Sequence, residues 1–264
     1  MAKKVYIDAG HGGSDVGAVK YVVERDVNLV MALACNEYLK AHGVTTKMSR
    51  TTNGAKPTIN TMAKAANDWN ADLVVSLHNN AGGGDGFEVF CSIVGGTGRD
   101  LAKNIEAEVK KIGQNSRGVK TKKNSEGDDY FGMIRLTDAP AVICEGAFVD
   151  HATDVKAIDT EAEQKEFGYA YARGILKTLG IADKGLKSEP AKSSSSSKKT
   201  TAKGYLVQVT ATALNIRSGA GTNYKKVGMI TDKGVYTIVE TKGNFGKLKS
   251  GAGWICLDYT KKVK

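Results

Sequence analysis

Two histidines and two glutamates occupy positions from which their side chains could act together. His11 follows the apolar run VYIDAG, and His78 closes the run LVVSL. Glu145 ends a third apolar run, PAVIC, and Glu24 opens the helical pattern that follows the first run. In an open α/β sheet, ligands bind beyond the carboxyl ends of the strands. We therefore expect His11, His78 and Glu145 to meet along one edge of a sheet, with Glu24 at the start of the helix that follows the first strand.

Their chemistry is typical of a catalytic zinc site. Two neutral imidazoles and a carboxylate form a familiar zinc ligand set that leaves a fourth position for water. Zinc lowers the pKa of that water to near ~7, and a second carboxylate can then move protons. His11, Glu24, His78 and Glu145 supply all of these groups. Singly, each histidine could instead be hydrogen-bonded to a loop, and Glu24 could be a helix-start carboxylate favoured by the helix dipole.

The remaining histidines have plainer interpretations. His42 lies in KAHGV, where Gly43 is typical of a helix end, so the sequence predicts a C-terminal cap. His151 lies in FVDHATD, six residues after Glu145. It is either a surface loop residue or a group near the substrate, and the sequence leaves both open.

The glycine-rich stretch around His11 does not match two common phosphate-binding motifs. GHGGSDVG lacks the Gly-Lys-Ser/Thr ending of a P-loop. It contains Gly-x-Gly, but Asp15 stands where a dinucleotide-binding motif has its third glycine. The stretch therefore lacks the residues that bind phosphate in a P-loop and in a dinucleotide-binding motif.

The first two thirds of the chain alternate between apolar, β-rich runs and helical patterns. The expected strands are residues 4–8, 44–49, 72–78, 86–93 and 140–145, and the expected helices span residues 27–38, 59–66, 101–112 and 167–178. This alternation predicts an α/β fold with a mostly parallel sheet and helices on both faces, within a domain of residues 1–181.

The rest of the chain has a different texture. Residues 182–203 are rich in serine and lysine and hold little to bury, so we expect a flexible linker. Residues 204–264 show short alternating runs separated by Gly, Asn and Asp, which predicts a small all-β barrel.

Charge separates the same two parts. The chain carries a net charge of +10, but residues 1–181 hold 22 basic and 23 acidic side chains, whereas residues 182–264 hold 16 and 5. The basic part could be attracted to an anionic wall or could be only solvated, and both interpretations stay open. It lacks the aromatic pattern of a nucleic-acid-binding surface, so we expect no nucleic acid partner.

Cysteine usage and hydropathy indicate in which cellular compartment the protein is expected. Cys35, Cys91, Cys144 and Cys256 form no C-x-x-C pair and sit among apolar residues, which favours buried, reduced thiols. The start of the chain has an apolar run of only three residues, too short for a secretory signal, and no run is long enough to insert into a membrane. We expect the protein to remain in the cytoplasm in which it is made until something releases it.

Taken together, YIDAGHGGSDVGAV, VERDVNL, LVVSLHNNA, GFEVF and VICEGAFVD resemble the zinc-dependent N-acetylmuramoyl-L-alanine amidases over about residues 3–180. The resemblance implies one Zn²⁺ bound by His11, Glu24 and His78, with Glu145 as the catalytic acid–base. Ala9 and Asn79 depart from the residues usual in the family.

The C-terminal stretches LNIRSGAGTNY and SGAGWI are similar to bacterial Src-homology-3-like domains of wall-degrading enzymes, over about residues 205–260. That resemblance implies a cell-wall-binding domain at residues 204–264, with peptidoglycan and anionic wall polymers as its partners. The oligomeric state is not indicated by the sequence.

Together the two resemblances imply an enzyme that hydrolyses the amide between N-acetylmuramoyl residues and L-alanine in peptidoglycan. The missing signal and the wall-type domain are typical of a phage endolysin, held in the host cytoplasm until a holin-type pore opens. A host autolysin or sporulation amidase of the same chemistry is the alternative, as is a metallopeptidase that cuts the stem peptide.

Overall fold

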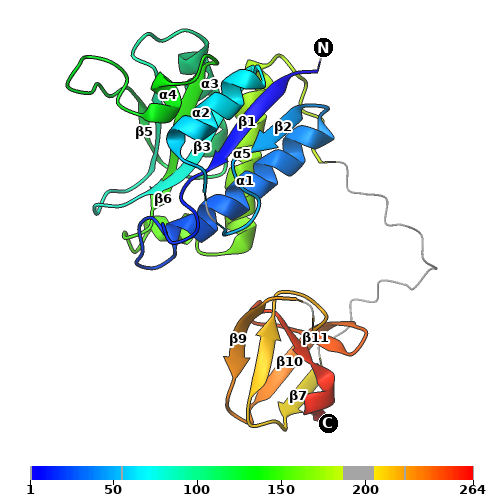
Figure 1. Cartoon of the computed structure of the whole chain (residues 1–264). Coiled ribbons are helices and arrows are strands. Elements are labelled where there is room, and N and C mark those ends of the chain that lie inside the picture. The colour runs from blue at the N-terminus through cyan, green and yellow to red at the C-terminus, as the bar shows by residue number, and fades with distance from the viewer. Residues whose placement is uncertain (1, 55, 187–204, 223, 264) are drawn as a thin grey trace. The chain divides into compact units, whose positions relative to one another are not determined.

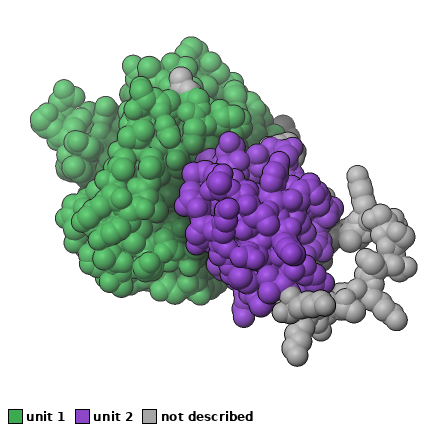
Figure 2. All heavy atoms as spheres, turned by 90° about the horizontal axis from the view of Figure 1, so that it is seen from below, with its two compact units in different colours: residues 1–190 green, residues 191–264 purple. Residues whose placement is uncertain are grey.

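A computed structural model of the 264-residue chain describes residues 2–54, 56–186, 205–222 and 224–263. The chain divides into two compact units, residues 1–190 and 191–264, which are coloured separately in Figure 2. Most of the predicted linker, residues 187–203, lies outside the described residues. The predicted domain boundaries therefore stay predictions.

A six-stranded sheet forms the centre of the first unit (Figure 1). Its strands are β1 (Lys4–Ala9), β2 (Thr45–Met48), β3 (Leu73–Asn80), β4 (Phe87–Cys91), β5 (Ser116–Lys120) and β6 (Ala141–Phe148), in the order β2-β1-β3-β6-β4-β5. Every neighbouring pair is parallel except β4 and β6. The predicted α/β fold with a mostly parallel sheet is confirmed.

Helices cover both faces of this sheet. One face packs against α1 (Glu24–Ala41), α3 (Thr97–Lys111) and α5 (Glu161–Thr178) in the larger apolar core. The other face packs against α2 (Ile59–Asp68) and the short α4 (Gly132–Arg135) in a smaller cluster. Because α2 and α4 are short, they cover less of their face than the three long helices cover of the other.

Strand alternation assigns the polar residues of the sheet to the α2/α4 face. Successive side chains of a strand point to opposite faces. Val5, Ile7 and Ala9 belong to the larger core, whereas Tyr6 packs with the smaller cluster, so Asp8 shares the side of Tyr6. Asp8 pairs with Ser76, and His78 pairs with Glu145 two residues further along. Asp8, Ser76, His78 and Glu145 thus form a polar column on the α2/α4 face of the sheet.

The second unit is an all-antiparallel sheet of seven strands, which confirms the predicted all-β class. The strands are β7 (Tyr205–Val209), β8 (Leu214–Arg217), β9 (Lys226–Ile230), β10 (Val235–Lys242), β11 (Phe245–Leu248), β12 (Trp254–Cys256) and β13 (Thr260–Val263). They enclose a small core made of Val207, Val209, Leu214, Ile230, Ile238, Leu248 and Ile255.

The four cysteines are free. Cys35, Cys91 and Cys144 are buried as expected, whereas Cys256 is partly exposed. Among the described residues, no helix has the length and apolar character needed to cross a membrane.

The helices of the larger core approach each other closely at two glycines. A Cβ at Gly168 in α5 would clash with the carbonyl oxygen of Met31 in α1, and one at Gly174 would press on the backbone of Ile105 in α3. Glycine costs about 0.5–1 kcal/mol relative to alanine inside a helix. At these two positions the absence of a side chain allows α5 to lie close to α1 and α3, and this packing offsets the cost.

We predict that Gly168→Ala lowers the free energy of unfolding by about 1–3 kcal/mol despite alanine's better helix propensity, because α1 and α5 must separate. Denaturant unfolding of the full chain measures the loss. The matched control is Gly98→Ala in α3, where the added Cβ would lie 3.6 Å from the oxygen of Ala141, an ordinary contact. Equal stability of the two variants would contradict close helix packing at Gly168.

Candidate metal centre

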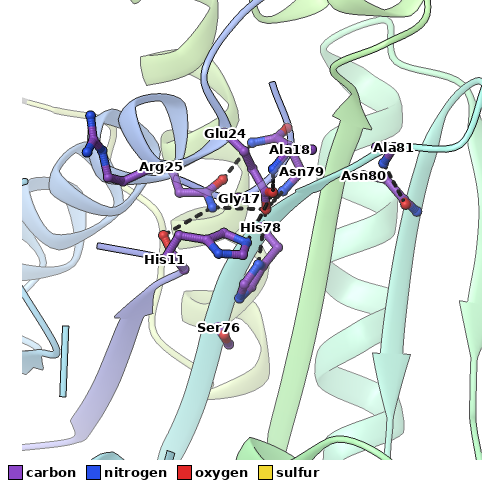
Figure 3. A network of polar contacts seen from close by, with 12 residues as sticks. His11, Gly17, Ala18, Glu24, Arg25, Ser76, His78, Asn79, Asn80 and Ala81 are labelled. Atoms are coloured by element: carbon purple, nitrogen blue, oxygen red, sulfur yellow. Dashed lines mark hydrogen bonds and ion pairs between the residues drawn. The ribbon is translucent and has the colours of Figure 1, made fainter. Parts of the chain in front are cut away.

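His11, Glu24 and His78 come together at the carboxyl edge of the sheet. His11 follows β1, Glu24 is the first residue of α1, and His78 lies near the end of β3. One ligand atom from each residue lies within 4.8 Å of the others. Figure 3 shows the imidazoles of His11 and His78 close to the Glu24 carboxylate. Residues 67 positions apart are thus joined by the parallel pairing of β1 with β3.

The Glu24 carboxylate is buried and bonded on both oxygens. Oε2 lies 3.1 Å from Nε2 of His11 and accepts the backbone N–H of Ala18. Oε1 lies 3.1 Å from Nδ1 of His78 and accepts the backbone N–H of Asn79. A charge in this setting persists only because these groups replace the water that burial removes.

These contacts shift proton affinities in the direction that favours metal binding by the carboxylate. Burial alone would raise the pKa of Glu24, but hydrogen bonds with His11 and His78 outweigh it and hold the pKa far below the usual value. The hydrogen bond to Glu24 raises the pKa of His11 above its usual value, against the opposing effect of burial. The site therefore contains an ionised carboxylate in contact with two imidazoles.

Asp15 is a participant that the sequence did not single out for this site. Its Oδ1 lies 2.9 Å from Nδ1 of His11, the nitrogen that faces away from Glu24. A proton on Nδ1 shared with Asp15 leaves the lone pair on Nε2, where a metal would bind. A carboxylate four residues after a candidate histidine was the available signal.

Arg50 supports the loop that carries His11 from behind. Its buried guanidinium donates to the carbonyl oxygens of Ala9, Gly10 and Arg25. His11 itself has a positive φ of 61°, an uncommon backbone conformation for a residue with a side chain. The hydrogen bonds of Arg50 thus stabilise the unfavourable backbone conformation at His11, in which the imidazole points toward Glu24.

Glu145 lies beside the three-residue group, opposite His78 in the β3–β6 pairing. Burial, reinforced by the charges of Glu24 and Glu88 and opposed by His78 and His11, raises the pKa of this carboxyl from 4.5 to about 7. A carboxyl group with a pKa near neutrality can both accept and release a proton at physiological pH.

A pocket of about 480 Å³ opens over these groups. One side is polar, and the other is apolar and contributed largely by α2, α4 and β6. The lining residues are Asp8, His11, Gly12, Asp15, Lys56, Pro57, Thr58, Ile59, Ser76, His78, Phe131, Gly132, Met133, Ile143 and Glu145. Three of the four predicted site residues line it, and the fourth, Glu24, contacts both histidines without lining the pocket.

The other two histidines lie outside this pocket. His42 is the C-terminal cap residue of α1, with Nδ1 2.8 Å from the carbonyl oxygen of Tyr38, as the sequence predicts. Nδ1 of His151 accepts the backbone N–H of Asp154 in a turn after β6. His151 therefore acts as a turn residue and does not line the pocket. Asn79 is also structural, because its buried amide bridges Asn28 and the backbone of Ala147.

The donor set fits zinc. Zinc in catalytic sites is held by three protein ligands, commonly two histidines and one carboxylate, with a further position open to solvent. His11, His78 and Glu24 supply two nitrogens and one oxygen, and both histidines line the pocket. Asp15 supplies the partner that commonly orients a metal-binding histidine from behind.

A sequence profile of the Amidase_3 family, described as N-acetylmuramoyl-L-alanine amidase, matches residues 5–177. The chain belongs to this family. The matched segment contains the whole candidate site and, except for Lys4 at the start of β1, all six strands of the first sheet.

Proteins similar to this chain include bacterial and phage proteins. The chain is 32% identical to the N-acetylmuramoyl-L-alanine amidase CwlM of Bacillus licheniformis over 183 residues, covering 67% of this chain and 69% of CwlM. It is 32% identical to the endolysin of Bacillus phage SPP1 over 202 residues, covering 73% and 72% of the two chains.

The solved catalytic domain of the amidase CwlV from Bacillus (Paenibacillus) polymyxa var. colistinus has the same fold. It superposes with a TM-score of 0.61 and 26% identity, covering 68% of this chain and 99% of that domain.

Asp15→Ala should weaken zinc binding by about 10–100-fold, because His11 loses the partner that fixes its orientation. Asp15→Asn, which keeps an oxygen acceptor but loses the charge, should show a smaller loss. Competition with a chromophoric chelator measures the dissociation constant. Ser14→Ala, at the exposed neighbouring position, is the control. An unchanged affinity in Asp15→Ala would remove Asp15 from the site.

In the metal-free protein, Glu145→Gln should be stabilising at neutral pH. The raised pKa means that the folded state holds a proton which the unfolded state releases between pH 4.5 and about 7. The contribution of Glu145 to the unfolding free energy therefore falls across this window, and the glutamine variant lacks this contribution.

Below pH 4.5 the two proteins should be equally stable, and above pH 7 the variant should gain up to about 3 kcal/mol. Urea unfolding at several pH values, with Glu126→Gln in an exposed loop as the control, measures the difference. A difference independent of pH would mean that the pKa of Glu145 is not raised.

Proposed function

We propose that this chain hydrolyses the amide between N-acetylmuramoyl residues and L-alanine in peptidoglycan. The observation that carries the proposal is a buried carboxylate between two imidazoles, at the base of a pocket that also contains Glu145. Membership of the N-acetylmuramoyl-L-alanine amidase family supports the substrate class.

His11, Glu24 and His78 are the proposed ligands of one Zn²⁺. When bound, zinc supplies Lewis-acid polarisation of a carbonyl and a nucleophilic water near neutral pH. The protein's part is to hold three donor atoms in place before the ion arrives. Ala18, Asn79 and Asp15 do this through their contacts with Glu24 and His11.

Glu145 is the proposed general acid–base. Its carboxylate takes a proton from the attacking water and delivers it to the nitrogen of the departing L-alanine. The elevated pKa suits both halves of this transfer, because the group gains and loses a proton with little cost near pH 7. In the described chain no hydrogen bond ties its carboxylate to another side chain, which leaves it available to substrate and water.

The apolar wall of the pocket has a positioning role in this proposal. Phe131 packs against Phe90 at 4.8 Å between ring centroids, and Met133 and Ile143 belong to the smaller core cluster. These side chains are fixed by the fold and exclude water from one side of the reacting amide. Exclusion of water strengthens electrostatic interactions in the site.

The biological setting that we propose is host lysis by a phage endolysin at the bacterial cell wall. The similarity to the SPP1 endolysin supports it, and the basic second unit would act as a Src-homology-3-like wall-binding domain. The similarity to CwlM supports the alternative of a bacterial autolysin with the same chemistry.

Digestion of purified cell walls by the full chain should release intact stem peptides with a new N-terminal alanine and leave glycan strands without peptides. Mass spectrometry of the products distinguishes this from a peptidase, which would shorten the stem peptides. Metal-free protein should release neither product, and added Zn²⁺ should restore release.

The Glu145→Gln variant should lower kcat by about 10²–10⁴-fold while retaining one bound zinc, and the exposed-loop Glu126→Gln variant should behave as the unaltered enzyme. Normal turnover by Glu145→Gln would exclude the proposed acid–base.

A further inference from the structure

Lys56 is the single lysine or arginine among the residues that line the metal-centre pocket in the described chain. It lies in the loop between β2 and α2, immediately before Pro57 and the helix cap residue Thr58. No motif or spacing in the sequence singles out Lys56, and no step of the proposed hydrolysis uses it.

The fold holds the Lys56 side chain against a buried carboxylate. Nζ of Lys56 lies 3.5 Å from Oδ2 of Asp8, and the lysine side chain is only 16% exposed. Asp8 is fully buried, and its Oδ2 accepts a hydrogen bond of 2.7 Å from Ser76. Its other oxygen, Oδ1, has no hydrogen-bond partner in the described chain. Asp8 and Ser76 therefore form a rigid, buried surface against which the ammonium group of Lys56 lies.

The position of Lys56 relative to the reacting groups follows from two contacts. A Cβ on Gly12 would lie 2.7 Å from Cβ of Lys56, so the lysine packs on the residue next to His11. Ser76 lies two residues before His78 on the same face of β3, as Figure 3 shows. The ammonium group therefore shares the pocket with the metal centre and lies toward its Asp8 side.

We infer that Lys56 binds a carboxylate of the stem peptide and so selects substrates that carry a free acid near the scissile amide. This inference rests on the proposed function. An ammonium has three donors, and the described chain offers Nζ one ionic partner at a distance longer than a close hydrogen bond. A partly desolvated cation gains most from an anionic acceptor.

The chemistry of the substrate identifies that acceptor. The hydroxyl, acetamido and lactyl amide groups on the glycan side of the scissile bond are neutral. The carboxyl groups of the peptide carry the negative charge. Lys56 is therefore assigned to the peptide side of the pocket.

The test uses the full chain, zinc-loaded, and two soluble substrates. One is an N-acetylmuramoyl peptide with free carboxylates, and the other is the same compound with its carboxylates converted to primary amides. We expect the unaltered enzyme to prefer the free acid by roughly 10- to 100-fold in kcat/KM, mainly through KM. Lys56→Met should bring this preference close to unity, and Lys56→Arg should retain most of it.

Two outcomes would overturn the inference. An unaltered enzyme without a preference has no carboxylate subsite. A Lys56→Met variant that keeps the preference but loses kcat on both substrates acts through Asp8 or through folding. Lys64→Met, the same substitution at an exposed lysine of α2, is the matched control and should keep the preference.

Two further measurements distinguish this inference from a loss of folding and from a failure of the proposed function. If Lys56→Met is unstable, Asp8→Asn/Lys56→Met removes both charges together and should show the same lost preference. Calorimetric binding to Glu145→Gln measures the acid-over-amide preference without turnover. A preference that persists there and disappears with Lys56→Met supports the lysine even if the cleaved bond differs from the one proposed. Equal binding of the two compounds overturns it.

Discussion

The desolvated carboxylate of Glu24 is the interaction on which the site depends. Buried ionised groups are tolerated only when hydrogen bonds and charges replace lost hydration. Glu24 obtains them from both histidines and from the backbone of Ala18 and Asn79. His11 and Ala18 lie in the loop after β1, and His78 and Asn79 lie near the end of β3, so both of these segments must form together with the start of α1, which carries Glu24.

Glycines near His11 make this convergence sterically possible. A Cβ at Gly10 would collide with the ring of His78, and one at Gly17 would collide with Glu24. Gly17 also has a positive φ of 64°, which side chains seldom tolerate. Gly10 and Gly17 therefore provide space for the side chains of His78 and Glu24, which explains why glycines stand close to His11 in the sequence.

The sequence predicted the elements with strong periodicity and missed those without it. Strands β1, β3 and β6 are nearly continuous apolar runs, as expected for parallel strands covered on both faces. Strand β5 (SRGVK) contains one large apolar residue and lies at the sheet edge, and α4 has only four residues. Neither gives a periodic signal long enough to recognise.

The same limit applies to the site. Strand ends and a helix start pointed to His11, Glu24, His78 and Glu145, because parallel strands align their carboxyl ends. Asp15, Arg50 and Lys56 act from loops, where spacing along the sequence does not determine which atoms meet. Their contacts depend on the positive φ at His11 and on the path of the chain after β2.

The two faces of the sheet have different roles: one contributes most of the apolar packing, and the other carries the residues of the candidate site. The α1/α3/α5 face is filled with apolar side chains and close helix contacts, whereas the α2/α4 face carries the polar column of Asp8, Ser76, His78 and Glu145. Carboxylates outnumber lysine and arginine in the pocket lining, with Asp8, Asp15 and Glu145 against Lys56, and with Glu24 behind the histidines. A divalent cation between the two imidazoles would offset this excess where the carboxylates are least hydrated. The charge distribution thus favours the same ion as the donor atoms do.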